Sequence, residues 1–383
     1  MRILIIILGV CLFAISCKKS DDINPVYQDT SGLSLNNDIE NLKSRIAYSN
    51  EIINFSEGNK SLQYTLVASI EPHTINGHIL SATSVTAEND FAYVSFHTRG
   101  ETIGGEILSL DVSVPDAPVI LQSATSTVYD FNDLSLSSDQ SKLWVCGDEL
   151  IRTWGQAFAM ELSLNNSHIP QAEANWIKSF DSYSANSITP TSKNGEDLLW
   201  ITSGSNGGLS VYDQNNPENT IYSFQERYNK HFDASRDYGV TIFGVDENSS
   251  VIRVFDLNTL FEYTDYTIPY DVTQLGKNGI SVDRNMAYLA MGESGLIAFD
   301  LRNGVITDIF RADKDGLANS VFVEKDFIYL AYGAAGLFIL DKRRMESLGN
   351  WDYEGSCNYV TVVHETVFVA NGDVDGFLIL VKN

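Results

Sequence analysis

Short apolar runs alternate with polar turns from about residue 61 to the end of the chain, and one arrangement of them recurs seven times. Each copy has an apolar run centred on an aromatic residue, a turn, and a second apolar run that ends in an acid in six copies. The clearest copies occupy residues 285–300 and 326–341. The aromatic residues are Tyr93, Trp144, Trp200, Phe243, Tyr288, Tyr329 and Phe368. Self-similarity at roughly 40–50 residues predicts a series of repeated β-sheet units.

Each unit contains four segments of strand length, as in 319–324, 327–332, 336–341 and a run that ends near Trp351. Four-stranded units in series are typical of the blades of a β-propeller. The seventh unit reaches Asn383 after three strands, whereas an unpaired strand at about 62–70 precedes the first unit. Pairing of these two segments would close the ring and remove its exposed edges. The sequence therefore predicts an all-β, seven-bladed β-propeller over residues 61–383.

The acids that end the third strands are expected to shape the turns that follow them. They are Asp111, Glu161, Asp213, Asp256, Asp300 and Asp341. Because a carboxylate at a turn accepts nearby backbone N–H groups, a structural role is favoured over a catalytic one.

The first sixty residues differ in character from the repeats. One positive charge, an apolar stretch from Ile3 to Ile15 and a small residue predict a signal peptide over residues 1–16, too short to span a bilayer as a lasting helix. Residues 17–60 are polar and are expected to form a tether. Within the tether, four apolar residues near helical spacing after Asn37 predict a short helix; they are Ile39, Leu42, Ile46 and Ile53.

Residues 14–17 resemble a bacterial lipoprotein box, which implies that Cys17 becomes the N-terminus and carries lipid such as palmitate. A plain signal peptide with an incidental Cys is the alternative. Residues 18–22 resemble the export tag of Bacteroidetes lipoproteins, a Lys followed by acids. That resemblance implies an outer-membrane protein exposed at the cell surface, with a periplasm-facing protein as the alternative. Each buried methylene contributes about 0.8 kcal/mol, so three acyl chains anchor firmly.

The repeats resemble the LVIVD-repeat propellers, a family named for an apolar strand that ends in Asp. The match is clearest at residues 106–118 and 209–217, whereas later copies lose the Pro-rich turn. Members of the family are typically surface or secreted bacterial proteins, so the resemblance implies a fold and a location but no activity.

The chain has 50 acidic and 25 basic residues, a formal net charge of −25. Such a charge excludes nucleic acid as a partner and disfavours anionic lipid heads, so membrane attachment is expected only through the lipid on Cys17. Four Cys residues occur, of which Cys146 and Cys357 are expected to be buried thiols, with a single disulfide as the alternative. We expect a monomeric propeller.

No spacing of His or Cys predicts a metal site, and no phosphate loop or nucleophile elbow occurs, so no cofactor is expected. Residues 371–376 carry oxygen ligands at alternate positions, which gives a weak calcium candidate at Asn371, Asp373 and Asp375. A turn is favoured there, because the equivalent turns of other blades have no such ligands.

Five Asn residues stand just before the first strand of a blade, and these are Asn132, Asn186, Asn278, Asn319 and Asn358. Since innermost strands line the axis of a propeller, the five side chains are expected to converge at one mouth of the channel. They either hydrogen-bond a polar ligand such as a glycan or fix the entry turns through local backbone bonds.

Blades one and two carry about five extra residues between their second and third strands, on the same face as the Asn residues. The extra loops contain candidate binding residues, namely His97, Arg99, Glu101, Arg152 and Trp154. Loops on a rigid scaffold often carry function, although a drifted insertion is the alternative.

These patterns favour a binding or interaction module that uses the channel mouth, with a glycan or an envelope protein as partner. One alternative is an enzyme acting on a polysaccharide or lactone, which would use acids or His at the same mouth: Asp133, Asp148, Glu149 and His231. A structural subunit of an envelope complex is the third hypothesis.

Overall fold

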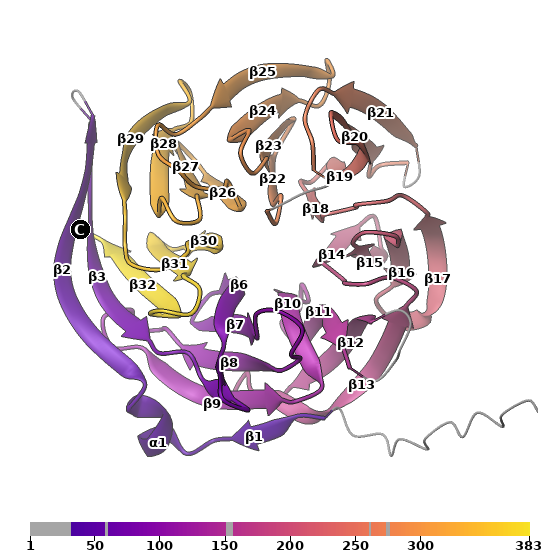
Figure 1. Ribbon diagram of the computed structural model, residues 1–383. Coiled ribbons are helices and arrows are strands. Elements are labelled where there is room, and N and C mark those ends of the chain that lie inside the picture. Colours follow the sequence, from indigo (N-terminus) through magenta and orange to yellow (C-terminus); the bar gives the residue numbers. More distant parts are fainter. Residues whose placement is uncertain (1–31, 58–59, 151–155, 260–261, 273–275) are drawn as a thin grey trace, which may run out of the picture.

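Seven antiparallel β-sheets stand around a common axis and form a ring (Figure 1). A computed structural model describes residues 32–57, 60–150, 156–259, 262–272 and 276–383. The innermost strands of neighbouring sheets contact one another in chain order, and the innermost strand of the last sheet contacts that of the first. The predicted seven-bladed propeller is therefore confirmed.

Each blade has its first strand next to the axis and its later strands successively farther out. The strands of blades one to three are β6 (Ser81–Glu88), β7 (Phe91–His97), β8 (Gly105–Asp111), β9 (Val119–Ser126); β10 (Tyr129–Leu136), β11 (Lys142–Glu149), β12 (Ala157–Leu164), β13 (Pro170–Phe180); and β14 (Ser187–Lys193), β15 (Glu196–Ser203), β16 (Gly208–Asp213), β17 (Asn216–Phe224). Blades four to six follow as β18 (His231–Ala234), β19 (Tyr238–Asp246), β20 (Ser249–Asp256), β21 (Tyr263–Ile268); β22 (Ile280–Asp283), β23 (Met286–Ala290), β24 (Leu296–Asp300), β25 (Val305–Phe310); and β26 (Ser320–Glu324), β27 (Phe327–Ala331), β28 (Leu337–Asp341), β29 (Glu346–Trp351).

The seventh blade joins the two ends of the chain. Its inner strands are β30 (Tyr359–Val363), β31 (Thr366–Ala370) and β32 (Phe377–Lys382), and its fourth is β3 (Lys60–Ile70). The pairing of β3 with β32 places Thr65 opposite Val381. The predicted closure by a strand at about 62–70 is confirmed. A small hairpin, β4 (Thr74–Ile75) and β5 (His78–Ile79), leads from β3 to the first blade.

The predicted tether contains more structure than the sequence suggested. Three elements, which we call the N-terminal belt, lie along the outer edge of the ring: β1 (Ser34–Asn36), α1 (Ile39–Lys43) and β2 (Ile46–Glu57). Strand β1 extends the first blade by pairing with β9, and β2 extends the seventh by pairing with β3. The folded part thus begins near residue 34 rather than 61.

The helix predicted to reach Ile53 is wrong beyond Lys43. Ile53 and Phe55 are buried whereas Ile52, next to Ile53, is exposed, which is the alternation of a strand. The separation of seven residues from Ile46 to Ile53 fits the helical period, but the segment pairs with β3 as a strand that has a bulge between Tyr48 and Glu51.

Arg45, between α1 and β2, fastens the belt to the first blade. Its guanidinium donates two hydrogen bonds to the fully buried carboxylate of Glu106, at 2.6 and 2.9 Å. A paired, two-pronged contact of this kind stabilises a buried charge and fixes geometry.

The acids at the ends of the third strands shape turns, as predicted, in five of six blades. In each, the carboxylate accepts a backbone N–H two residues on, at distances of 2.8–3.0 Å; the acids are Asp111, Asp213, Asp256, Asp300 and Asp341. Glu161 instead accepts from Lys142 and Asn175, at 3.1 and 2.9 Å. Its longer side chain reaches neighbouring side chains rather than its own turn.

The repeated aromatic residues belong to the scaffold, because six of them are buried in the packing between blades and Phe243 is half-buried. Cys146 and Cys357 are buried free thiols, as predicted. Within the part of the chain that the structure describes, no helix is long and apolar enough to cross a membrane.

Candidate functional site

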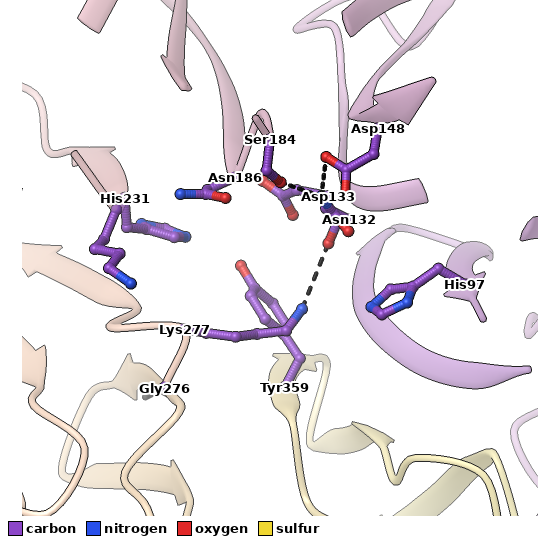
Figure 2. Close-up of a pocket in the computed structure, with 11 residues that line it drawn as sticks. His97, Asn132, Asp133, Asp148, Ser184, Asn186, His231, Gly276, Lys277 and Tyr359 are labelled. Carbon is purple, nitrogen blue, oxygen red and sulfur yellow. Dashed lines mark hydrogen bonds between the residues drawn. The ribbon is translucent and has the colours of Figure 1, made fainter. Parts of the chain in front are cut away.

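One mouth of the central channel opens into a pocket of about 190 Å³, which we call the mouth pocket. Side chains from several blades converge on it (Figure 2). The lining residues are His97, Asn132, Asp133, Asp148, Ser184, Asn186, Lys230, His231, Gly276, Lys277 and Tyr359. The lining is mostly polar, so the pocket is suited to a ligand with several hydrogen-bonding groups.

Lys277, which sequence reasoning missed, extends from blade five across the channel. Its ammonium donates to the carbonyl oxygen of Thr83 in blade one at 2.6 Å. It also donates to that of Asn132 in blade two at 3.4 Å (Figure 2). Gly276 before it has φ +107°, a conformation that L side chains rarely adopt, so glycine suits the bend that sends Lys277 inward. Burial lowers the pKa of Lys277 to about 8, because the interior disfavours its charge.

His231 lines the mouth pocket at the start of β18, and its ring is directed into the pocket (Figure 2). Its Nδ1 accepts the backbone N–H of Ile280 at 3.4 Å, while its buried Nε2 has no hydrogen-bond partner among the described residues. Burial lowers the pKa of His231 to about 4, so the ring is neutral at pH 7. With Nδ1 accepting, the proton is assigned to Nε2, which is then a free donor.

Asp133, His231 and Tyr359 also border a second cavity of about 170 Å³ in the channel, on the far side of these residues. These three residues therefore separate the two cavities, whereas Lys277 lines the mouth pocket and not the second cavity. Burial raises the pKa of Tyr359 well above its usual value, so its hydroxyl stays protonated.

Asp133 lines the mouth pocket and also holds neighbouring blades together. Its carboxylate accepts from the hydroxyl of Ser84 at 2.6 Å and the backbone N–H of Ile188 at 3.0 Å, which links blades one, two and three. Burial raises its pKa, while these hydrogen bonds and the charge of Lys277 oppose the rise.

Asp148 has an acidity suited to proton exchange near neutral pH. Burial, with a smaller contribution from the neighbouring charge of Asp130, raises the pKa of Asp148 to about 7. Asn132 donates to it at 3.4 Å. Asp130 accepts from the backbone of Thr98 and Gly104 at 3.3 and 2.8 Å, so its role is to hold the long loop of blade one.

Four of the five Asn residues stand just before the first strand of their blade, as predicted, whereas Asn132 lies within β10 at a bulge, and four of the five connect neighbouring blades. The carboxamide N–H groups of Asn132, Asn186, Asn319 and Asn358 donate to the backbone carbonyls of Ala185, Asn229, Cys357 and Ala82, at 2.8–3.3 Å. Asn278 donates within its own blade to Ala290 at 3.3 Å. Only Asn132 and Asn186 of the five line the mouth pocket.

Of the candidate residues in the two long loops, one lines the mouth pocket, two do not, and two lie outside the described residues. His97 lines the mouth pocket, and burial lowers its pKa to about 4. Arg99 forms an ion pair with Asp373 of blade seven at 3.0 Å, and Glu101 is exposed. Arg152 and Trp154 lie outside the described residues, as does Cys17. Glu149, an acid considered for catalysis, is buried but is not part of the pocket lining.

The weak calcium candidate forms a turn between β31 and β32. Asn371 donates to the carbonyl of Glu354 at 2.8 Å, and Asp373 pairs with Arg99. Burial, together with Glu354 and Glu71, raises the pKa of Asp375. In the described ranges, no three His, Cys, Asp or Glu residues are grouped to hold a metal ion.

Two lysines in the mouth pocket replace residues that the repeat would lead one to expect. Lys230 occupies in blade four the position that Asn319 and Asn358 occupy in their blades, since each stands just before the first strand and donates its backbone N–H to a carbonyl of the second strand. Lys277 precedes Asn278, where Ala318 and Cys357 precede the other Asn residues. Departures from the repeat at these positions are the signal in the sequence by which the lysines could have been found.

Among solved structures, the chain is similar to the β-propeller domain of Doa1, a WD40 domain. The TM-score is 0.54 and the sequence identity 12%, and the match covers 84% of this chain and 97% of that one. A likeness at this identity shows the fold alone. No protein-family model matches the chain, and a search of curated proteins found no match.

Proposed function

We propose that this chain is a lipid-anchored outer-membrane protein that binds a glycan in the mouth pocket. The propeller supplies a rigid ring, and propellers commonly serve as binding modules. The observation that carries the proposal is the buried Nε2 of His231, a donor without a partner among the described residues in a polar pocket. An unsatisfied buried donor costs about 1–3 kcal/mol, which a ligand that supplies an acceptor removes.

Lys277 adds a second donor to the same pocket. An ammonium has three N–H groups, and two of them are accounted for by the carbonyls of Thr83 and Asn132. The pocket therefore favours a ligand rich in acceptor oxygens, such as the hydroxyls of a sugar. A carboxylate on that sugar would also offset the charge of Lys277.

The size of the pocket favours the end of a glycan over a flat protein surface. Its volume of about 190 Å³ is below the roughly 300–1,000 Å³ of sites that enclose whole drug-sized ligands. It admits a terminal group, while the rest of a longer ligand lies on the rim. An envelope-protein partner would have to insert a protruding side chain or chain end.

The test is a glycan array probed with the full-length chain purified in detergent, followed by titration of the best ligand. His231→Phe keeps a ring but removes Nε2, and we expect it to weaken binding at least about tenfold. His78→Phe is the matched control, because His78 is exposed in β5 away from the pocket. Saccharide binding that His231→Phe leaves intact would contradict the mouth pocket as the site.

Lipid anchoring is supported by the sequence, through Cys17 and the residues that follow it. Cys17→Ser should abolish incorporation of labelled palmitate and shift the protein out of the membrane fraction. Protease treatment of intact cells then distinguishes surface from periplasmic exposure. Palmitate incorporation that persists in Cys17→Ser would contradict the anchor.

Asp148 favours one alternative, an enzyme acting on a polysaccharide or lactone. A carboxyl whose pKa burial raises to about 7 is suited to act as a general acid or base. If the pocket is catalytic, hydrolysis of a bound glycan follows Asp148 in its pH profile and is lost in Asp148→Asn. A bound glycan that is recovered unchanged supports the binding module.

A further inference from the structure

We infer that the face opposite the mouth carries a second binding site, for a saccharide that bears sulfate or phosphate groups. A groove of about 440 Å³ lies there between blades four and five. It is formed by the turn after β18, the turn after β22 and the turn after β24, which contribute Arg236, Arg284 and Arg302. We call it the arginine groove.

The arginine groove is positive although the chain has a formal net charge of −25. Its two acids are paired with lysines of the flanking blades, Asp237 with Lys193 at 2.9 Å and Asp283 with Lys342. Among the described residues, none of the three arginine side chains has an ion pair or a hydrogen bond. The flanking lysines thus offset the charges of the two acids, to which Arg236 and Arg302 add at longer range on Asp237, and the three guanidinium groups keep their hydrogen-bond donors for a ligand.

The backbone of the groove is held by contacts from adjacent blades. The Lys193 ammonium donates to the carbonyl of Arg236 at 2.6 Å, and the Ser235 hydroxyl donates to that of Arg284 at 2.9 Å. The backbone N–H of Arg302 donates to Asp300 at 2.9 Å. Since all three arginines project from fixed turns, less order is lost when they bind a ligand together.

Arg284 is the first residue of the two-residue turn between β22 and β23. It has φ +57°, and the same turn position holds Asn89, Asn194, Lys325 and His364 in blades one, three, six and seven, with φ 51°, 54°, 38° and 49°. Asn tolerates this left-handed conformation far better than a long side chain does. The position therefore admits a long side chain in several blades at some conformational cost, and in blade five it places a guanidinium beside the groove.

The chemistry of the groove suits an oxyanion on a hydroxyl-rich carrier. A guanidinium forms paired hydrogen bonds with sulfate or phosphate oxygens. Tyr238 and Asn285 line the same groove and offer neutral partners for sugar hydroxyls. The groove is concave, so a soluble saccharide chain fits it better than a flat membrane surface does. This site does not depend on the mouth pocket.

The experiment is a binding titration of the full-length chain with a heparin-derived octasaccharide as the sulfated probe, in parallel with inorganic phosphate and with vesicles containing an anionic phospholipid. We expect saturable binding of the octasaccharide that weakens as salt is raised. Each of Arg236→Gln, Arg284→Gln and Arg302→Gln should weaken it about tenfold, and Arg284→Lys less, because Lys keeps the charge but not the fork.

The control has the same change in net charge at exposed cations outside the groove: Lys43→Gln, Arg227→Gln and Lys314→Gln, each made singly. These variants should retain octasaccharide binding. Equal losses in the controls and in the groove variants would overturn the site. Binding to vesicles alone, or to neither saccharide nor phosphate, would overturn the assigned ligand. Since all substitutions are on the surface, thermal unfolding should confirm that each variant is folded.

Discussion

Arg253 and Lys277 are both cations buried in the ring, but their surroundings differ. Arg253 lies in β20 of blade four, 6% exposed, and donates to Asp265 at 2.7 and 2.8 Å and to Glu226. The rings of Tyr263 and Phe224 cover it, at 4.2 and 4.7 Å from the guanidinium carbon. The charge of the arginine is matched by two carboxylates, so it supports the blade and leaves little for a ligand.

Lys277 has two backbone carbonyls as its hydrogen-bond partners and, in the described segments, no carboxylate within ion-pairing distance. The pKa of Lys277 is lowered to about 8 because burial destabilises its charged form. The pKa of Arg253 is raised instead, because the hydrogen bonds and charges of Asp265 and Glu226 outweigh the effect of burial. A buried cation with a structural role, such as Arg253, is paired with carboxylates that match its charge. An incompletely paired cation in a pocket indicates selection for something other than stability.

The largest effect is expected from Arg253→Met. The substitution leaves Glu226 half-buried without its partner, so we expect the free energy of unfolding to fall by about 3–5 kcal/mol. Urea denaturation of the full chain measures it. Arg253→Lys should be intermediate because it keeps one charge but not the paired geometry. A loss below about 1 kcal/mol would mean that the aromatic packing, not the ion pairs, holds the site.

Lys277→Met should change the free energy of unfolding in the opposite direction and make the protein more stable. Lowering the pKa from 10.5 to about 8 corresponds to about 3 kcal/mol at neutral pH, and the two lost hydrogen bonds offset about half of it. We therefore expect Lys277→Met to be more stable by about 1–2 kcal/mol at pH 7 and to lose glycan binding.

The pH dependence checks this sign. The folded pKa of Lys277 is below the unfolded value, so between pH 8 and 10.5 the unfolded chain binds more protons. The stability of the wild type therefore rises through that window and the advantage of Lys277→Met disappears. Denaturation curves of both proteins at pH 7 and pH 10 are the measurement. An advantage that persists at pH 10 would contradict the role of charge burial.

Asp148→Asn tests whether burial of a charge in the mouth pocket also destabilises the fold when the charge is negative. The folded pKa of about 7 lies above the usual 3.8, so ionisation destabilises the fold as pH rises from about 4 to about 7. Because Asp148 is partly exposed, we expect the variant to gain only about 1 kcal/mol at pH 8 and nothing at pH 4. Thermal unfolding at the two pH values tests the sign.

The smallest effect concerns the amide links between blades. Asn358→Ala removes the hydrogen bond to Ala82 across the junction of blades seven and one, and should cost about 1 kcal/mol. Asn278→Gly is its counterpart within one blade, because Gly tolerates the φ of +53° at this position and the carboxamide oxygen of Asn278 has no partner among the described residues, so its cost should be near zero. Equal losses in thermal unfolding would show that bridging the blades adds nothing.

The fold could be predicted because the same local sequence pattern recurs in each blade. The aromatic positions and turn acids such as Asp300 recur at fixed spacing, and the unpaired strand before the first unit identified how the ring closes. The N-terminal belt could not be read in this way, since it occurs once. Residues 46–57 became a strand only because β3 offers them an edge.

The site was predicted in place but only partly in composition. The face, the long loop with His97, and His231 and Asp148 were identified from position, whereas the Asn series mostly links blades. Lys277 escaped because a lysine before an apolar run reads as an ordinary surface charge. Its contact with Thr83, 194 positions earlier in the chain, depends on ring closure, which no local pattern contains.

The closure of the ring also sets the order in which the protein can fold. Tyr64 pairs with Lys382, so the seventh blade cannot be completed until β32 has been synthesised. Contacts of such long sequence separation form slowly. The hairpin of β2 and β3 can form earlier, and one edge of β3 then stays unpaired. Strand β32 of another copy can pair with that edge as well as β32 of the same chain can. Strand exchange at high expression should therefore begin at this blade, and the belt would be carried along with it.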